Sequence, residues 1–306
     1  MPVYPGALQR GFCDNNRIVS GLPTIQESSG GGSNRNAECD HFYGCLWLHV
    51  GQCDMSLRTY LVSVGLSAGL TLLCTLPFVL VALWRSRIRR WGLVLFVGSL
   101  VILENAIAEL PRVNGFQHLH WSWQAAILTT ALTLLVVWLA PGVSFASIGV
   151  TSSLQPGWLK PAIPALLIAA AVPAVFFILG ARVRLTGEGW AYLLVMPGLA
   201  EELLFRGLYQ SLLNSALGRC WRFGGAQFGL GLLITSVLFA GANGLVAVDG
   251  QLHARIVLPA AIAPFMLSLV SGWVRERTNS VWPSVFGHNL SNIVIPVATL
   301  VSRSIH

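Results

Sequence analysis

Two glutamates and an arginine lie close together in the stretch LAEELLFRGLY, residues 199 to 209. Glu202 and Arg206 are four residues apart, so on a helix they face each other and can form an ion pair. Glu201 points about 100° away from that pair. A carboxylate beside a neutralised pair can serve as a general base toward water. The alternative is a charge cluster that only packs helices together.

Two further polar groups lie in later apolar segments. In FGHNLSN, His288 and Asn292 are four residues apart on one helix face, and both can donate a hydrogen bond to a developing oxyanion. In SVLFAGANGL, Asn243 follows Phe239 by four residues and is the only strongly polar side chain nearby. Alone, each group is equally well explained by hydrogen bonds that bridge helices. Together with Glu201 they predict one shared polar pocket.

The elements that must position these groups are apolar helices. Hydrophobic residues make up 54% of the 306 positions and charged residues only 10%, which excludes an ordinary soluble domain. The net charge of +7 comes from arginines at the ends of apolar runs. That pattern suits phospholipid head groups and argues against nucleic acid as a partner. We therefore predict an all-α polytopic membrane protein.

Eight apolar segments approach the length of about 20 residues that a bilayer crossing needs. They are predicted at 59 to 83, 92 to 110, 124 to 141, 161 to 180, 190 to 216, 225 to 247, 254 to 274 and 281 to 302. The arginine-rich run WRSRIRRW, residues 84 to 91, follows the first segment, and the positive-inside rule places it in the cytoplasm. Both chain ends are then outside, and the connection at 142 to 160 is cytoplasmic.

The chain is expected to have three parts. Residues 1 to 54 contain the low-complexity run QESSGGGSNRN and are predicted to be a disordered tail, with Met55 as a candidate natural start. Residues 55 to 142 are expected to hold the N-terminal transmembrane helices. Residues 143 to 306 carry the polar motifs.

Two acids in the second predicted span, Glu104 and Glu109, stand in the stretch LENAIAELPR. An acid inside a membrane span indicates a functional site by default. Glu109 is three residues from Arg112 and can reach it along a helix. We interpret the two acids as an interfacial or helix-packing pair.

The three polar motifs, in this order, resemble the CAAX protease and bacteriocin-processing (CPBP) family, intramembrane endopeptidases that include the type 2 CAAX prenyl protease. The family signature reads EExxxR, then FxxxH, then HxxxN or HxxxD. Here the first motif is EELLFRG, with Glu201, Glu202 and Arg206, and the third is HNLSN, with His288 and Asn292. The run SGWVRERTNSVWPSVFGHNLSN is also similar to the family's approach to its last motif.

The second motif departs from the family pattern, because Asn243 stands where the family carries histidine. The resemblance implies that the glutamate matching Glu201 and that histidine activate a water. It also implies that the residues matching His288 and Asn292 stabilise the oxyanion. An asparagine cannot accept a proton from water, so Glu201 would be the sole base. An amide is also a poor zinc ligand, so a zinc cofactor is possible but disfavoured.

The resemblance covers about residues 143 to 302 and implies that the last four spans enclose a polar cavity. We expect an intramembrane endopeptidase that hydrolyses membrane-anchored peptides with a glutamate-activated water, with Glu202 and Arg206 as a buried structural pair. The alternative is a weakened or inactive member that binds a membrane peptide or acts as an immunity or scaffold protein. A proton-relaying transporter lacks support from repeat symmetry. The expected location is the bacterial inner membrane, and the sequence leaves the substrate and its prenylation open.

Overall fold

The computed structural model describes residues 56–84, 90–112, 123–151, 157–180, 183, 185–248 and 252–304. The tail predicted at residues 1–54 and most of the arginine-rich loop lie outside the described residues. The three-part division of the chain therefore stays a prediction.

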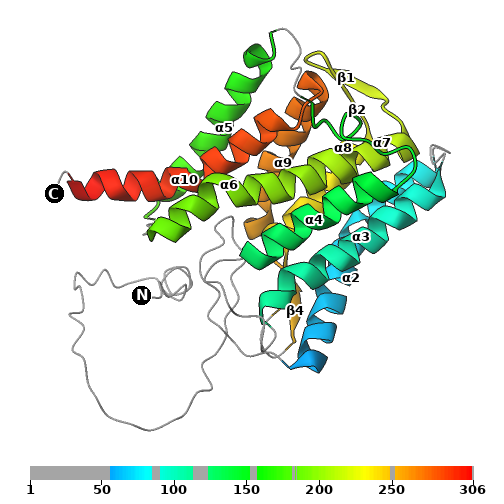
Figure 1. The fold of residues 1–306 in the computed structure, drawn as a ribbon, viewed down its shortest axis with the longest axis horizontal. Helices are drawn as coiled ribbons and strands as arrows, with labels where there is room; N and C mark the ends of the chain where they lie inside the picture. The colour runs from blue at the N-terminus through cyan, green and yellow to red at the C-terminus, as the bar shows by residue number, and fades with distance from the viewer. Residues whose placement is uncertain are drawn as a thin grey trace.

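Helices dominate the described residues, and a helix lies at each of the eight predicted spans (Figure 1). Their bounds are α2 Leu57–Trp84, α3 Trp91–Glu109, η1 Leu110–Arg112, α4 Trp123–Leu139, α5 Leu159–Ile178, α6 Gly187–Glu202, η2 Leu203–Tyr209, α7 Gln210–Leu217, α8 Leu230–Ala240, η3 Gly241–Leu245, α9 Leu258–Thr278 and α10 Trp282–Ser304. Within the described residues, α2, α3, α5 and α10 are long and apolar enough to cross a bilayer. The fold is that of an all-α membrane protein, and the count of eight spans stays a prediction.

Two short antiparallel hairpins interrupt the helices. One pairs β1 (Trp221–Phe223) with β2 (Ala226–Phe228), and the other pairs β3 (Val246–Val248) with β4 (Ala254–Ile256). The predicted helix over 225 to 247 is therefore wrong at both ends, and α8 has only 11 residues. Gly224 and Gly225 have φ values of +56° and +82° and form the two-residue turn of the first hairpin.

One continuous helical rod runs through α6, η2 and α7, and its middle seven residues are wound as a π-helix. Such wide turns inside α-helices are often found at functional sites. Gly207 lies in this π-helix, and a Cβ there would be 3.2 Å from the carbonyl oxygen of Ile148. The connection that follows α4 therefore packs directly against the π-helix.

Helices α6 and α10 are joined where the first and third polar motifs lie. Pro197 interrupts α6, and the next residue, Gly198, donates its N–H to Asn289 Oδ1 at 2.8 Å. The Asn289 amide in turn donates to the carbonyl oxygen of Val195 at 3.4 Å. A Cβ at Gly198 would lie 2.6 Å from the carbonyl oxygen of Val285, so only glycine permits this close crossing.

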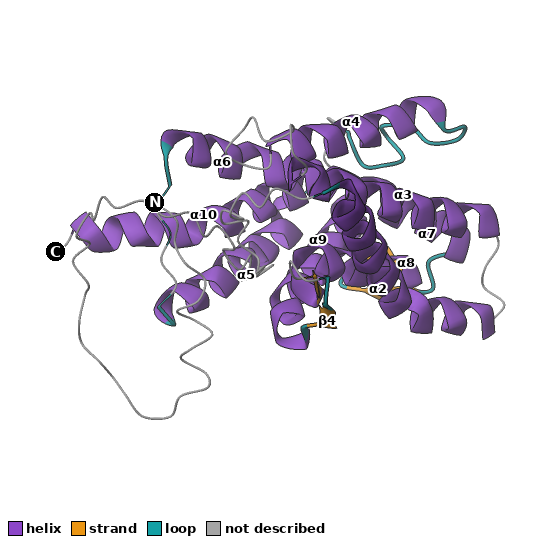
Figure 2. Ribbon diagram, turned by 90° about the horizontal axis from the view of Figure 1, so that it is seen from below, coloured by secondary structure: helices purple, strands orange, loops and turns teal. Residues whose placement is uncertain are grey.

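The helices form two groups with α9 between them. Figure 2 shows α5, α6 and α10 gathered on one side and α2, α3, α7 and α8 on the other. Helix α9 packs against α8 on one flank and against α5 and α10 on the other. The polar motifs on α6, η3 and α10 therefore meet near the middle of the protein.

The connection predicted to be cytoplasmic lies against the C-terminal end of α9. Arg275 Nη2 donates to the carbonyl oxygen of Ser147 and to the hydroxyl of Ser211, each at 2.8 Å. Arg219 Nε donates to Glu276 Oε2 at 2.9 Å. The segments predicted to share one side of the membrane thus lie together, while the assignment of that side to the cytoplasm stays a prediction.

Candidate active site

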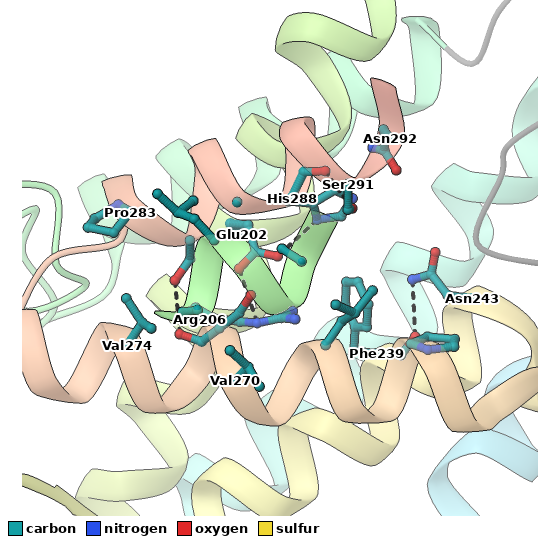
Figure 3. A pocket seen from close by; sticks show the side chains of 18 residues that line it. Glu202, Arg206, Phe239, Asn243, Val270, Val274, Pro283, His288, Ser291 and Asn292 are labelled. Carbon is teal, nitrogen blue, oxygen red and sulfur yellow. Dashed lines mark hydrogen bonds and ion pairs between the residues drawn. The ribbon is translucent and has the colours of Figure 1, made fainter. Parts of the chain in front are cut away.

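The carboxylate of Glu202, at the end of α6, joins two of the polar motifs (Figure 3). Its Oε2 lies 3.1 Å from Arg206 Nε, which confirms the ion pair that the spacing predicted. Its Oε1 lies 2.9 Å from His288 Nδ1 on α10. The Glu202 and Arg206 side chains are each only 1% exposed. The sequence did not predict the contact between Glu202 and His288.

The guanidinium of Arg206 lies over the ring of Phe239, with Cζ 4.0 Å from the ring centroid. Phe239 also packs edge to face against Phe205 and His288. The ion pair does not satisfy the whole guanidinium, because Arg206 Nε and Nη1 have no hydrogen-bond partner of good geometry among the described residues. A desolvated cation over an aromatic face gains about 2 kcal/mol, so Phe239 contributes to holding this charge.

The second motif meets the first through its asparagine. Asn243 Nδ2 donates to Glu201 Oε2 at 3.2 Å and to the carbonyl oxygen of Phe239 at 3.1 Å. The backbone leaves helical geometry at Asn243 and continues through Gly244 at φ +134°, a value that favours glycine. Because the helix ends at this point, the amide turns toward α6. The predicted convergence of the first two motifs is therefore present.

A cavity with about 580 Å³ of empty space, part of it open to the outside, adjoins these groups. Five of the predicted site residues line it: Glu202, Arg206, Asn243, His288 and Asn292. The amide of Asn292 is 7% exposed, and its Nδ2 has no hydrogen-bond partner. Buried amides are nearly always paired, so this donor is available to a bound group.

The cavity is not enclosed by the last four predicted spans alone. Ala165, Leu166 and Ala169 of α5 also line it, and α9 contributes an apolar wall that includes Leu267 and Val270. The prediction omitted α5 because its sequence carries no polar motif. The walls of the cavity around the polar groups are therefore mostly apolar.

Glu201, the sixth predicted residue, lines a neighbouring cavity instead. Glu104 on α3 lines this second cavity too, and it lines a third cavity together with Glu109. Glu104 and Glu109 are 9% and 6% exposed, as side chains packed between helices are, and their position relative to the membrane interface stays a prediction. The two cavities meet at Asn243, which lines the first and hydrogen-bonds to Glu201.

Two contributions to the site were missed at the level of sequence. Asn289 joins α10 to α6 by a hydrogen bond. Pro197 could have indicated this contact, because a proline inside α6 removes a helical hydrogen bond and leaves backbone groups that a side chain can bind. Glu104 faces the same cavity as Glu201, and its signal is the lack of any basic residue within a helical turn on either side.

No three His, Cys, Asp or Glu side chains of the described residues come together as possible ligands of a metal ion. The site instead offers carboxylates, one imidazole and amides. These groups can move a proton and can donate hydrogen bonds to an oxyanion.

Comparison with known proteins finds a family model that matches the part of the chain with the polar motifs. Residues 185–294 match the family model described as type II CAAX prenyl endopeptidase Rce1-like. The match begins just before α6 and extends into α10, so it includes all three motifs. No curated protein and no solved structure matches the chain.

Proposed function

We propose that the protein is an intramembrane protease of the CAAX protease family, which its matched region supports. Its substrate would be a membrane-associated peptide, hydrolysed by a water that Glu201 activates. The observation that carries the proposal is the meeting of three motifs: Glu202 bridges Arg206 and His288, while Glu201 accepts a hydrogen bond from Asn243. In the proposal a peptide carbonyl reacts near Asn243, between the cavity that His288 and Asn292 line and the cavity that Glu201 lines.

Glu201 is the better candidate for the base. Both oxygens of Glu202 are already engaged, by Arg206 and by His288. Glu201 is less deeply buried than Glu202, and one of its oxygens contacts Asn243. In the proposed step, water attacks the peptide carbonyl carbon and its proton moves to Glu201. Glu201 then gives that proton to the departing amine as the C–N bond breaks.

Asn243 would position the water rather than deprotonate it. Its Nδ2 is committed to Glu201 and to the carbonyl of Phe239, whereas its Oδ1 makes no hydrogen bond within the described part of the protein. That oxygen can accept from one proton of the water while Glu201 takes the other. Asn243 therefore supplies orientation without a second base.

His288 and Asn292 would hold the oxyanion. His288 Nδ1 donates to Glu202, so an imidazolium at this position presents Nε2–H to the cavity. Asn292 Nδ2 is buried, unpaired and on the same cavity wall. A single donor of this kind contributes on the order of 100- to 1,000-fold to the rate.

The charges of the proposed resting state balance. Glu201 and Glu202 contribute two negative charges, and Arg206 and the His288 imidazolium contribute two positive charges. Charges inside a membrane are tolerated when they are paired in this way. No step in the proposal requires a metal ion, and we propose that zinc is not a cofactor.

The test is a cleavage assay on the purified protein in lipid nanodiscs. The probe is a quenched fluorescent peptide ending in a Cys-aliphatic-aliphatic-X sequence, supplied farnesylated and, in parallel, unprenylated with an N-terminal myristoyl chain. Glu201→Gln should lower kcat/KM by about 100- to 10,000-fold. Glu188→Gln, in the first turn of the same helix, is the matched control and should retain activity. Full activity of Glu201→Gln contradicts the assignment.

One further variant separates an enzyme from a peptide-binding member that has lost its activity. Asn243→His restores the family's second-motif base and should raise kcat/KM in an active but weakened protease. Binding of the peptide without cleavage, in both the natural chain and Asn243→His, would favour a binding, immunity or scaffold role. We also propose that the protein lies in a bacterial inner membrane.

A further inference from the structure

A second acid stands beside the proposed base. Glu104 of α3 and Glu201 of α6 line the same cavity, although 97 positions separate them in the chain. They lie close enough for their charges to interact. The cavity walls are otherwise formed mainly by small and aromatic residues, among them Ala108, Ala200 and Phe205.

The surroundings of Glu104 offer it no cation. Its side chain is 9% exposed, and its Oε2 accepts a hydrogen bond from Asn105 Nδ2 at 3.2 Å. Among the described residues that line the cavity there is no lysine, arginine or histidine. The hydroxyl of Tyr209 is fully buried, has no hydrogen-bond partner and lies within electrostatic range of Glu104. It is a donor available to that carboxylate.

Two buried carboxylates without a cation between them cannot both ionise at neutral pH. Their repulsion adds to the cost of removing each from water, and pairs of this kind hold one proton between them. Arg206 and His288 are already balanced by Glu202 and Glu201. A negative charge on Glu104 would therefore be left uncompensated inside the membrane.

We propose that Glu104 and Glu201 share one proton and act together as the base of the site. That the two acids pair is argued from the cavity that they share. That the pair acts as the base rests on the proposed function. The pairing deepens the role of Glu201, because the neutral Glu104 carboxyl can stabilise the ionised base beside it, where Asn243 supplies no second base. A residue of the N-terminal helices, outside the matched region 185–294, then belongs to the site.

The proton count closes over one turnover. At rest the pair holds one proton and one negative charge. When water attacks the peptide carbonyl carbon, its proton moves to Glu201 and the pair holds two protons. Glu201 then protonates the amine as the C–N bond breaks, and the pair returns to one proton. Water and peptide become a carboxylic acid and an amine, with Glu104 unchanged.

The neighbouring titratable groups divide between the two sides of Glu201. Glu109 lies beyond Glu104 on α3, and Tyr192 of α6 lines the shared cavity. The ion pair and His288 lie on the other side, beyond Asn243. Glu109 lines a cavity together with Glu104 but does not line the cavity of Glu201. It therefore tests whether the pairing belongs to Glu201 or to any acid near Glu104.

The test combines infrared spectroscopy with the cleavage assay. Difference spectra of the purified protein during a pH titration follow the carbonyl stretch of protonated carboxyl groups. Glu104→Gln and Glu201→Gln should each shift the titration of this band to lower pH by about one unit or more, because the remaining carboxylate no longer faces a second negative charge. Glu109→Gln should shift the band by less than Glu201→Gln does, because Glu109 does not line the cavity that Glu104 and Glu201 share.

The cleavage arm asks whether the shared proton is used. Glu104→Gln should lower kcat/KM by about 10- to 100-fold and move the acid limb of its pH profile to higher pH, because the neutral Glu104 carboxyl no longer stabilises ionised Glu201, while Glu109→Gln retains activity. The loss should be smaller when Asn243→His is also present, because the imidazole then supplies a second base. Equal losses in both backgrounds, with an unshifted profile, contradict a catalytic role for Glu104.

The infrared result stands apart from the proposed function. Unshifted bands in both glutamine variants overturn the shared proton even if the protein is an active protease. If the bands shift in both glutamine variants but the protein cleaves no peptide, the shared proton is supported and the proposed function is overturned. If Glu104→Gln fails to fold, the Glu201→Gln titration still reports the band of Glu104 and decides the pairing.

Discussion

Replacing Arg206 by methionine should destabilise the protein mainly by leaving Glu202 without its cation. Arg206 is fully buried, lies 3.1 Å from Glu202 and covers the ring of Phe239. Removing one partner of a buried ion pair costs about 3–5 kcal/mol, and the lost contact with the aromatic face accounts for about 1–2 kcal/mol. Methionine keeps an apolar stem of similar length, so little of the loss comes from an empty space.

The same substitution should cost much less when Glu202 is already glutamine. In that background no carboxylate is left unpaired, and the substitution also removes a buried cation that has lost its partner, so the net cost should be below the about 1–2 kcal/mol of the lost contact with Phe239. The two backgrounds should therefore differ by about 2 kcal/mol or more, which is the coupling energy of the pair. His288 contacts Glu202 on the other oxygen and limits the difference, because an imidazolium partly replaces the missing charge.

Reversible unfolding in mixed micelles measures these free energies, with the fluorescence of the 11 tryptophans as the signal. The natural chain, both single variants and the double variant form a complete cycle. A coupling energy below about 0.5 kcal/mol would show that the ion pair does not hold the site together, and the reasoning about buried charge would be refuted.

Three further predictions concern the backbone and the chemistry. Asn289→Ala should lower the free energy of unfolding by about 1–3 kcal/mol and reduce cleavage, because α10 loses its hydrogen bond to Gly198. An unchanged midpoint of chemical unfolding would contradict this prediction. Gly244→Ala should cost about 1–2 kcal/mol in the same measurement because φ is +134° there, whereas Gly65→Ala, in open space within α2, should cost nothing measurable. Chelators should leave cleavage unchanged, and a loss that zinc restores would overturn the metal-free proposal.

The helices and one ion pair could be predicted because they depend on local periodicity. Apolar runs of about 20 residues marked the position of every helix that now forms the bundle. The four-residue spacing of Glu202 and Arg206 predicted their contact because neighbours on one helix face are fixed by the helix itself. The spacing holds even though a π-helix begins between them.

Contacts between helices could not be predicted in the same way. The bond from His288 to Glu202 depends on how far α10 is rotated and shifted against α6, and no pattern along one helix contains that information. The position of Glu104 beside Glu201 depends on α3 reaching the same cavity. The hairpin turn could have been predicted, because the adjacent glycines Gly224 and Gly225 are typical of such a turn. We predicted a helix there because the residues that follow are apolar.

The short helix α8 has a consequence for where solvent is found. Its 11 residues cover about 16 Å, roughly half of a hydrocarbon layer about 30 Å thick. Backbone without helical hydrogen bonds is tolerated at that depth only when protein or water surrounds it. The helix breaks at Asn243 in η3, just after α8, and acidic cavities lie beside this break. We therefore expect water, and not acyl chains, to surround the backbone there.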